Sequence, residues 1–70
     1  MHTSPATQDA APSLLRIEKV LQRTSLGRTA TYELIARGQH PAPIKVGRSS
    51  VWLAREIDGW IEQLAAQRGL

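Results

Sequence analysis

Hydrophobic residues recur at helical spacing in three stretches of the chain. In the first stretch, four residues share one face of a helix of about two turns: Ile17, Val20, Leu21 and Thr24. A second helix is predicted from Arg28 to Arg37, with Gly27 as its N-cap and Gly38 closing it in the left-handed conformation. Its apolar face is formed by Ala30, Thr31, Leu34 and Ile35, and its opposite face by Arg28, Thr29, Tyr32, Glu33 and Ala36.

A β-hairpin and a third helix are predicted after the second helix. Two runs of strand-forming residues, Ile44–Val46 and Ser50–Leu53, flank a three-residue loop, Gly47–Ser49, which is typical of a hairpin. The third helix is expected over Ala54–Gln67, on the spacing of Leu53, Ile57, Trp60, Ile61 and Leu64. The order helix, turn, helix, hairpin, helix predicts a mainly α fold with a small β-hairpin, a winged helix-turn-helix.

The sequence also predicts the surroundings of several individual residues. Trp52, Trp60 and Leu64 are expected in the hydrophobic core. The alternative for the two tryptophans is a platform on which unpaired bases stack. Gly59 stands inside the third helix, where glycine costs roughly 1 kcal/mol relative to alanine, so we expect a close backbone contact there. His40 is expected to be a loop residue rather than a ligand.

The beginning of the chain lacks the regular spacing of apolar residues that predicts helices and strands elsewhere. Residues 1–13 contain two prolines and one charged residue, and no large aliphatic residue follows Met1. Such a segment buries too little apolar surface to offset the entropy lost on ordering. We therefore expect a disordered N-terminal tail over residues 1–13 and one folded domain over residues 14–70.

Composition favours a small module that binds a partner. The chain has 70 residues, no cysteine and two histidines, which leaves no disulfide framework and too few ligands for an ordinary structural metal site. Neither a signal peptide nor a membrane-spanning run is found, so we expect a cytoplasmic protein. Nucleophile-elbow, phosphate-loop and dinucleotide-binding motifs are missing, and we expect no enzyme activity, no catalytic residue, no metal and no cofactor.

Positive charge is concentrated in the middle of the chain. The segment from Arg16 to Arg55 holds eight Lys or Arg residues and two Glu residues, whereas residues 56–70 hold one Arg and three acidic residues. The net charge of +3 therefore hides a basic stretch that can attract a polyanion. The alternative is an unevenly charged surface that is merely solvated.

The start of the second helix carries the first group of candidate DNA-binding residues. In a helix-turn-helix, the first residues of the second helix reach base edges in the major groove. Arg28 can donate two hydrogen bonds to guanine, Thr29 can contact a base edge or a thymine methyl group, and Tyr32 can bond a phosphate. Glu33 would repel phosphates, and we expect it to pair with Arg37 one turn later. The alternative leaves Arg28 solvated and Tyr32 half-buried.

The hairpin carries the second group of candidates. Four residues lie at or beside its turn: Lys45, Arg48, Ser49 and Ser50. A basic, hydroxyl-rich turn can follow a phosphate backbone or insert an Arg into a narrow minor groove. Arg23 and Arg16 are further candidates for phosphate contacts. The alternative is a polar turn that only aids solubility.

Four segments of the chain form a combined pattern: Leu14–Ile17, Ser25–Tyr32, Pro41–Gly47 and the stretch from Val51 to Ile61. This combination resembles the AlpA family, small prophage-encoded transcriptional regulators related to excisionases and to MerR-type DNA-binding domains. The resemblance implies a winged helix-turn-helix on double-stranded DNA, with the second helix in the major groove and the wing on the flanking backbone or minor groove. It places five candidates at matching positions: Arg28, Thr29, Tyr32, Lys45 and Arg48. The sequence departs from the family's usual residues at Gly27, Thr31 and Glu33.

Three functions fit this pattern. The first is a sequence-specific regulator of prophage or mobile-element genes, associated with the nucleoid, with double-stranded DNA as its partner and RNA polymerase as a candidate partner. The second is an excisionase-like factor that bends DNA and steers a recombinase. The third is a protein-interaction adaptor that uses exposed parts of the third helix. The sequence leaves the oligomeric state open.

Overall fold

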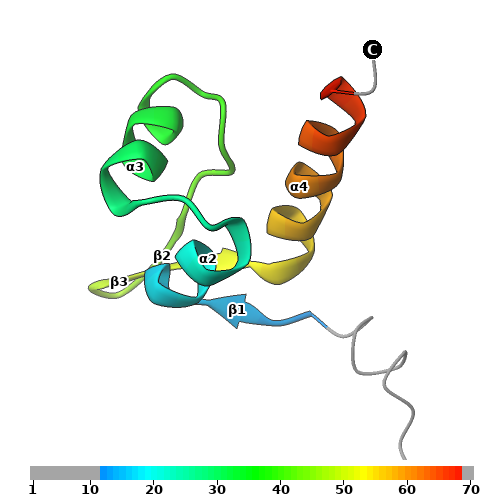
Figure 1. The fold of residues 1–70 in the computed structure, drawn as a ribbon. Helices are drawn as coiled ribbons and strands as arrows, with labels where there is room; N and C mark the ends of the chain where they lie inside the picture. Colours follow the sequence, from blue (N-terminus) through cyan, green and yellow to red (C-terminus); the bar gives the residue numbers. More distant parts are fainter. Residues whose placement is uncertain (1–11, 69–70) are drawn as a thin grey trace, which may run out of the picture.

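The chain folds into three helices and a small antiparallel sheet (Figure 1). A computed structural model describes residues 12–68. In chain order the elements are β1 (Leu14–Leu15), α2 (Ile17–Thr24), α3 (Arg28–Ala36), β2 (Ile44–Val46), β3 (Ser49–Leu53) and α4 (Ala54–Arg68). The predicted mainly α winged helix-turn-helix fold is confirmed, although α3 ends one residue earlier and α4 one residue later than expected. The expected disordered tail lies outside the described residues, apart from Pro12 and Ser13.

The hairpin is part of a three-stranded antiparallel sheet in the order β1-β3-β2. The sequence pattern does not predict β1, because a strand of two residues shows no period. Leu14 of β1 pairs with Leu53 of β3. Directly beside this pair, the Ala54 N–H donates to the Ser13 carbonyl at 2.8 Å. The start of the described chain is therefore tied to the start of α4.

The turn of the hairpin is shorter than predicted. Val46 pairs with Ser49, so only Gly47 and Arg48 lie between the strands, and the expectation of a three-residue loop is wrong because Ser49 belongs to β3. Gly47 has a φ of 60°, as the first central residue of a type II′ turn does, and glycine adopts this conformation without steric cost. We call the β2–β3 hairpin the wing, and Arg48 consequently lies at its end.

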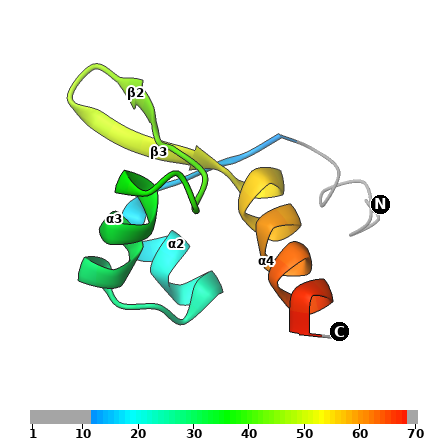
Figure 2. The ribbon, with the colours of Figure 1, turned by 90° about the horizontal axis from the view of Figure 1, so that it is seen from above.

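The hydrophobic core lies where β3 runs beside α2 and leads into α4 (Figure 2). Val20, Trp52 and Ile57 are fully buried, which confirms the expected place of Trp52. Four partly buried apolar residues pack around them: Leu15, Ile17, Ile35 and Ile61. The indole N–H of Trp52 donates to the Pro41 carbonyl at 3.0 Å, so the loop before β2 is held against the core.

Left-handed residues end both helices of the helix-turn-helix. Ser25 has a φ of 63° as the C-cap of α2. Gly38 has a φ of 73°; its N–H donates to the Ile35 carbonyl at 3.0 Å, and the Gln39 N–H donates to the Leu34 carbonyl at 2.9 Å. These two bonds form the Schellman motif, so the prediction that Gly38 closes α3 is confirmed.

Thr31 is the residue through which α3 is buried. Its side chain is fully buried, and its hydroxyl donates to the Gly27 carbonyl at 2.9 Å, which offsets the cost of removing a polar group from water. Leu34 and Ile35 are partly buried, as predicted, whereas Ala30 is exposed, contrary to the prediction. Thr31 therefore fills an inward position without leaving an unpaired hydroxyl.

Helix α4 is buried along its first half only. Ile57 belongs to the core, but Trp60 is half-buried and Leu64 is 44% exposed, so the expectation that both belong to the core is wrong. A Cβ placed on Gly59 would meet nothing within 4 Å, so the expected close backbone contact is also wrong. From Glu62 to Arg68 every residue is exposed. The helical spacing of apolar residues thus continues past the part of α4 that packs on the domain.

Both ends of the described chain leave the domain on one side. In Figures 1 and 2, the start of β1 and the end of α4 lie to the right of α3, and the turn of the wing lies at the left. Helix α3 also lies at the left in both views. The helix-turn-helix and the wing are therefore presented away from the chain ends.

Candidate nucleic-acid interface

Helix α3 presents one long side to solvent from its first residue onwards. The five residues of the predicted opposite face are all exposed: Arg28, Thr29, Tyr32, Glu33 and Ala36. Tyr32 is 43% exposed although it is aromatic. Because Thr31 is buried on the other side, this face is fixed outwards and its side chains are free to contact a partner.

The guanidinium of Arg28 is held only loosely. Its Nη2 lies 3.9 Å from Oε2 of Glu18 on α2, and both side chains are more than half exposed. Such an exposed pair is worth little, so Arg28 can exchange this carboxylate for another acceptor. The expected ion pair between Glu33 and Arg37 is wrong: the two side chains, both in the described part of the chain, form no salt bridge.

The N-terminus of α3 is suited to an anionic oxygen. Gly27 supplies no side-chain cap, and no acidic residue lies in the first turn. The first backbone N–H groups therefore have no side-chain acceptor, and the helix dipole adds partial positive charge at this end. Arg28 adds a full positive charge at the same place.

The wing presents a basic turn with hydroxyl groups behind it. Arg48 is exposed at the turn, and Ser49 and Ser50 are partly buried at the start of β3. Lys45 of β2 pairs with Ser50 across the hairpin, and its Nζ donates to the Ser50 hydroxyl at 2.9 Å. This bond directs the Lys45 ammonium along the strand pair.

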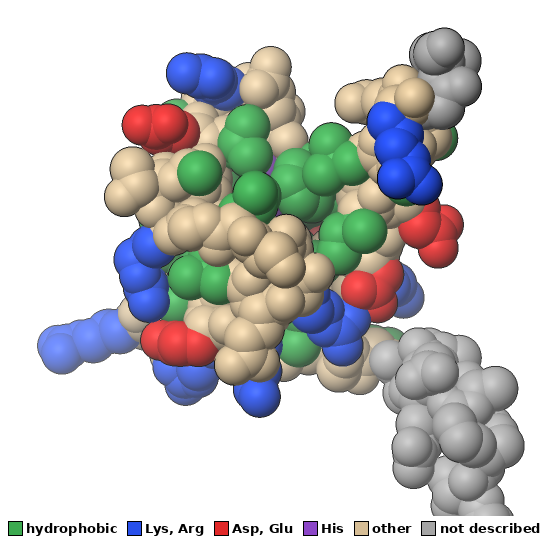
Figure 3. All heavy atoms as spheres, viewed as in Figure 1, with side chains coloured by type: hydrophobic (Ala, Val, Ile, Leu, Met, Phe, Trp, Pro, Cys, Tyr) green, Lys and Arg blue, Asp and Glu red, His purple; other side chains and the backbone are tan. Residues whose placement is uncertain are grey.

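The start of α3 and the turn of the wing lie on the same side of the molecule, at the left of Figures 1 and 2. Lys and Arg side chains project from this side, with acidic groups between them (Figure 3). The elements that carry the sequence-predicted residues Arg28, Thr29, Tyr32, Lys45 and Arg48 thus lie on one side. We call this set the basic face.

The guanidinium of Arg23 is bound to a carboxylate and is not free to contact a phosphate. Its Nη1 donates to both carboxylate oxygens of Asp58, at 2.6 and 2.8 Å, and so joins α2 to α4. To bind a phosphate, Arg23 would have to leave this carboxylate. Arg16 is exposed at the N-cap of α2 and has no such pair among the described residues.

The sequence reasoning missed the acid next to Arg28. Glu18 and Arg28 belong to different helices, so no helical spacing connects them. The signal was nevertheless present, because the short turn of a helix-turn-helix brings the first turn of one helix near the start of the next. Glu18 is therefore a neighbour of the basic face that the spacing of α3 alone could not show.

None of the helices formed by residues 12–68 is long and apolar enough to cross a membrane. The same residues contain no group of three His, Cys, Asp or Glu side chains placed to hold a metal ion.

Comparison with protein families adds a finding to this geometry. Residues 13–65 match the family described as prophage CP4-57 regulatory protein (AlpA). The chain belongs to the AlpA family. The matched AlpA region includes α3, the wing and the whole of the basic face. The family's description is that of a prophage regulatory protein.

A relative of this AlpA chain is found in Enterobacteria phage P4, where it is described as "Uncharacterized protein ORF88". The two are 34% identical over 55 residues, which cover 77% of this chain and 62% of the phage protein. The chain thus spans less than two thirds of that relative. No solved structure matches the chain.

Proposed function

We propose that this AlpA-family protein is a sequence-specific, double-stranded-DNA-binding regulator of prophage or mobile-element genes. The observation that carries the proposal is the basic face, in which the start of α3 and the wing are exposed on the same side. A duplex lying on that side meets a helix and a basic turn at once. Base recognition and backbone contact are then supplied by two different elements.

Helix α3 enters the major groove with its first turn against the bases. Arg28 donates two hydrogen bonds to a guanine, and Thr29 contacts the neighbouring base edge. Tyr32, one turn later, bonds a phosphate through its hydroxyl. The uncapped N–H groups at the start of α3 favour a phosphate oxygen at the groove edge.

The wing follows the flanking backbone. Arg48 at the turn and Lys45 along the strand supply positive charge that neutralises phosphates or enters a narrow minor groove. Ser49 adds a hydroxyl next to the turn. Arg23 contributes only if DNA displaces Asp58, so we place it at the edge of the contact surface.

Selection of bound DNA from a random pool, followed by quantitative binding, tests the proposal. Arg28→Ala should cost roughly 1–3 kcal/mol of binding and relax the preference at one base pair. Arg68→Ala, which removes the same charge from the far end of α4, is the matched control and should bind like the wild type. Unselective recovery from the pool, or equal affinity of Arg28→Ala and wild type, would exclude α3 as the recognition helix.

A footprint on the selected sequence separates two roles of the same surface. One site next to a promoter indicates a regulator that works with RNA polymerase. Several phased sites beside a recombination junction indicate an excisionase-like factor that bends DNA for a recombinase. Binding that is absent, or that does not weaken with salt, favours the protein-interaction adaptor instead.

A further inference from the structure

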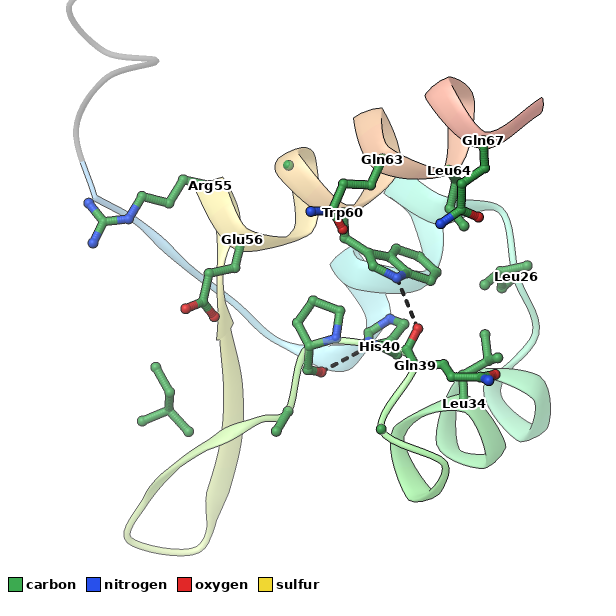
Figure 4. A pocket seen from close by; sticks show the side chains of 15 residues that line it. Leu26, Leu34, Gln39, His40, Arg55, Glu56, Trp60, Gln63, Leu64 and Gln67 are labelled. Atoms are coloured by element: carbon green, nitrogen blue, oxygen red, sulfur yellow. Dashed lines mark hydrogen bonds between the residues drawn. The ribbon is translucent and has the colours of Figure 1, made fainter. Parts of the chain in front are cut away.

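An open hollow separates α4 from α3 and the loop that follows it (Figures 3 and 4). It holds about 1120 Å³ and is lined on its walls by Leu26, Leu34, Ile44, Trp60 and Leu64. We call it the α3–α4 groove. Leu34 and Tyr32 are two residues apart in a helix, so the groove and the basic face lie on opposite sides of α3. A partner in the groove would leave the basic face free.

Trp60 is fixed at the bottom of the groove. Its indole N–H donates to the Gln39 carbonyl at 2.9 Å, and its ring centroid lies 4.5 Å from that of His40 (Figure 4). His40 is 6% exposed; its Nδ1–H donates to the Pro41 carbonyl, which leaves Nε2 as a buried acceptor without a donor in the described structure. The groove therefore offers a fixed aromatic surface.

The rim of the groove is almost free of charge. Gln39, Gln63 and Gln67 line its edges, and Arg55 and Glu56, which carry opposite charges, stand together at one end (Figure 4). A polyanion gains nothing there. An occupant that matches this surface has an apolar residue in the middle and uncharged polar groups on either side.

The chain itself contains a segment of that kind. Residues 63–67 of α4 read Gln-Leu-Ala-Ala-Gln, without a charge, and all are exposed. Leu64 in this segment is 44% exposed. Helical turns that pack on nothing are marginal in water, so the end of α4 gains stability from a contact that the described residues of the chain do not provide.

We infer that a second copy of the chain occupies the groove. The two copies are related by a two-fold axis, and the end of α4 from each lies in the α3–α4 groove of the other. Leu64 is both part of the groove wall and the residue that enters the partner's groove, as a self-complementary contact requires. The helices then form one layer in the order α3, partner's α4, α4 and partner's α3.

Sedimentation equilibrium without DNA tests this inference separately from the proposed function. An interface confined to one groove per copy is small, so association is expected at high micromolar to millimolar protein. The weight-average mass should rise from the monomer's 7.7 kDa towards twice that value. Leu64→Glu should remain monomeric. Gln22→Glu, an equal charge change at an exposed residue of α2 that lies outside the groove and outside residues 63–67, should associate like the wild type.

Circular dichroism confirms that each variant is folded before its mass is compared. A wild type that stays at the monomer mass throughout would overturn the inference, as would a Leu64→Glu variant that associates normally. Nuclear magnetic resonance identifies a different occupant. If the chain is monomeric and deletion of residues 1–11 shifts the Trp60 indole resonance, the chain's own first segment covers the groove and the two-fold pairing is wrong.

Discussion

Trp52 and Trp60 show how far identical side chains can differ in their contribution to stability. Trp52 is fully buried and bonded to Pro41, whereas Trp60 is half-buried on the wall of an open groove. We expect Trp52→Ala to lower the free energy of unfolding by about 3–5 kcal/mol and Trp60→Ala to lower it by clearly less. Urea denaturation followed by circular dichroism measures both. Equal losses would place Trp60 in the core after all.

Glu18 sets a second residue-scale expectation, in which DNA affinity changes and stability does not. Its carboxylate lies 3.9 Å from Arg28, on the side we propose for DNA. Glu18→Gln removes an acid that repels phosphates and frees Arg28, so affinity should rise severalfold at low salt, while stability changes by less than about 1 kcal/mol. The matched control is Glu62→Gln on α4. Weaker binding by Glu18→Gln would mean that Glu18 orients Arg28 for its contact with a guanine.

At the scale of elements, a glycine in its interior lowers the stability of α4. Gly59 lies in the helix interior, and an added Cβ would meet nothing within 4 Å. Gly59→Ala should therefore stabilise the domain by about 1 kcal/mol and raise Tm by about 4–8 °C. Gly38→Ala is the contrasting variant, because a φ of 73° strains an alanine and Tm should fall. Thermal unfolding that ranks the two in the opposite order would contradict this account.

The elements that the sequence predicts well are those whose signal is local. Helical spacing and the glycine at Gly38 located α2, α3 and α4, since period and capping are both decided within a few residues. Strand β1 was missed because its partner, β3, is remote in sequence and only the fold brings them together. Leu64 was misplaced for the opposite reason: its spacing is correct, but no other element reaches that far along α4.

The candidate site was predictable in its residues but not in their partners. The exposed face of α3 and the place of Arg48 follow from helix period and hairpin position. The bond between Arg23 and Asp58 joins residues 35 positions apart, and no local sequence pattern near either residue predicts it. Long-range pairing with acidic side chains therefore decides which Lys and Arg residues of a basic stretch remain available to bind phosphates. Only the fold shows that pairing.

For the whole molecule, the charge distribution predicts how DNA binding responds to salt. Each phosphate neutralised adds about −0.9 to the slope of log affinity against log salt concentration. Because Arg48 is exposed at the end of the wing, Arg48→Ala should reduce the steepness of that slope by about one such contact and leave sequence preference intact. Titrations at several salt concentrations measure the slope, with Arg68→Ala as reference. An unchanged slope would remove the wing from the contact.

The pairing of β1 with β3 has a practical meaning for anything joined to this domain. Because Ser13 is anchored at Ala54, a module joined before Ser13 would begin beside the start of α4, whereas α3 and the turn of the wing lie to the left of it in Figures 1 and 2.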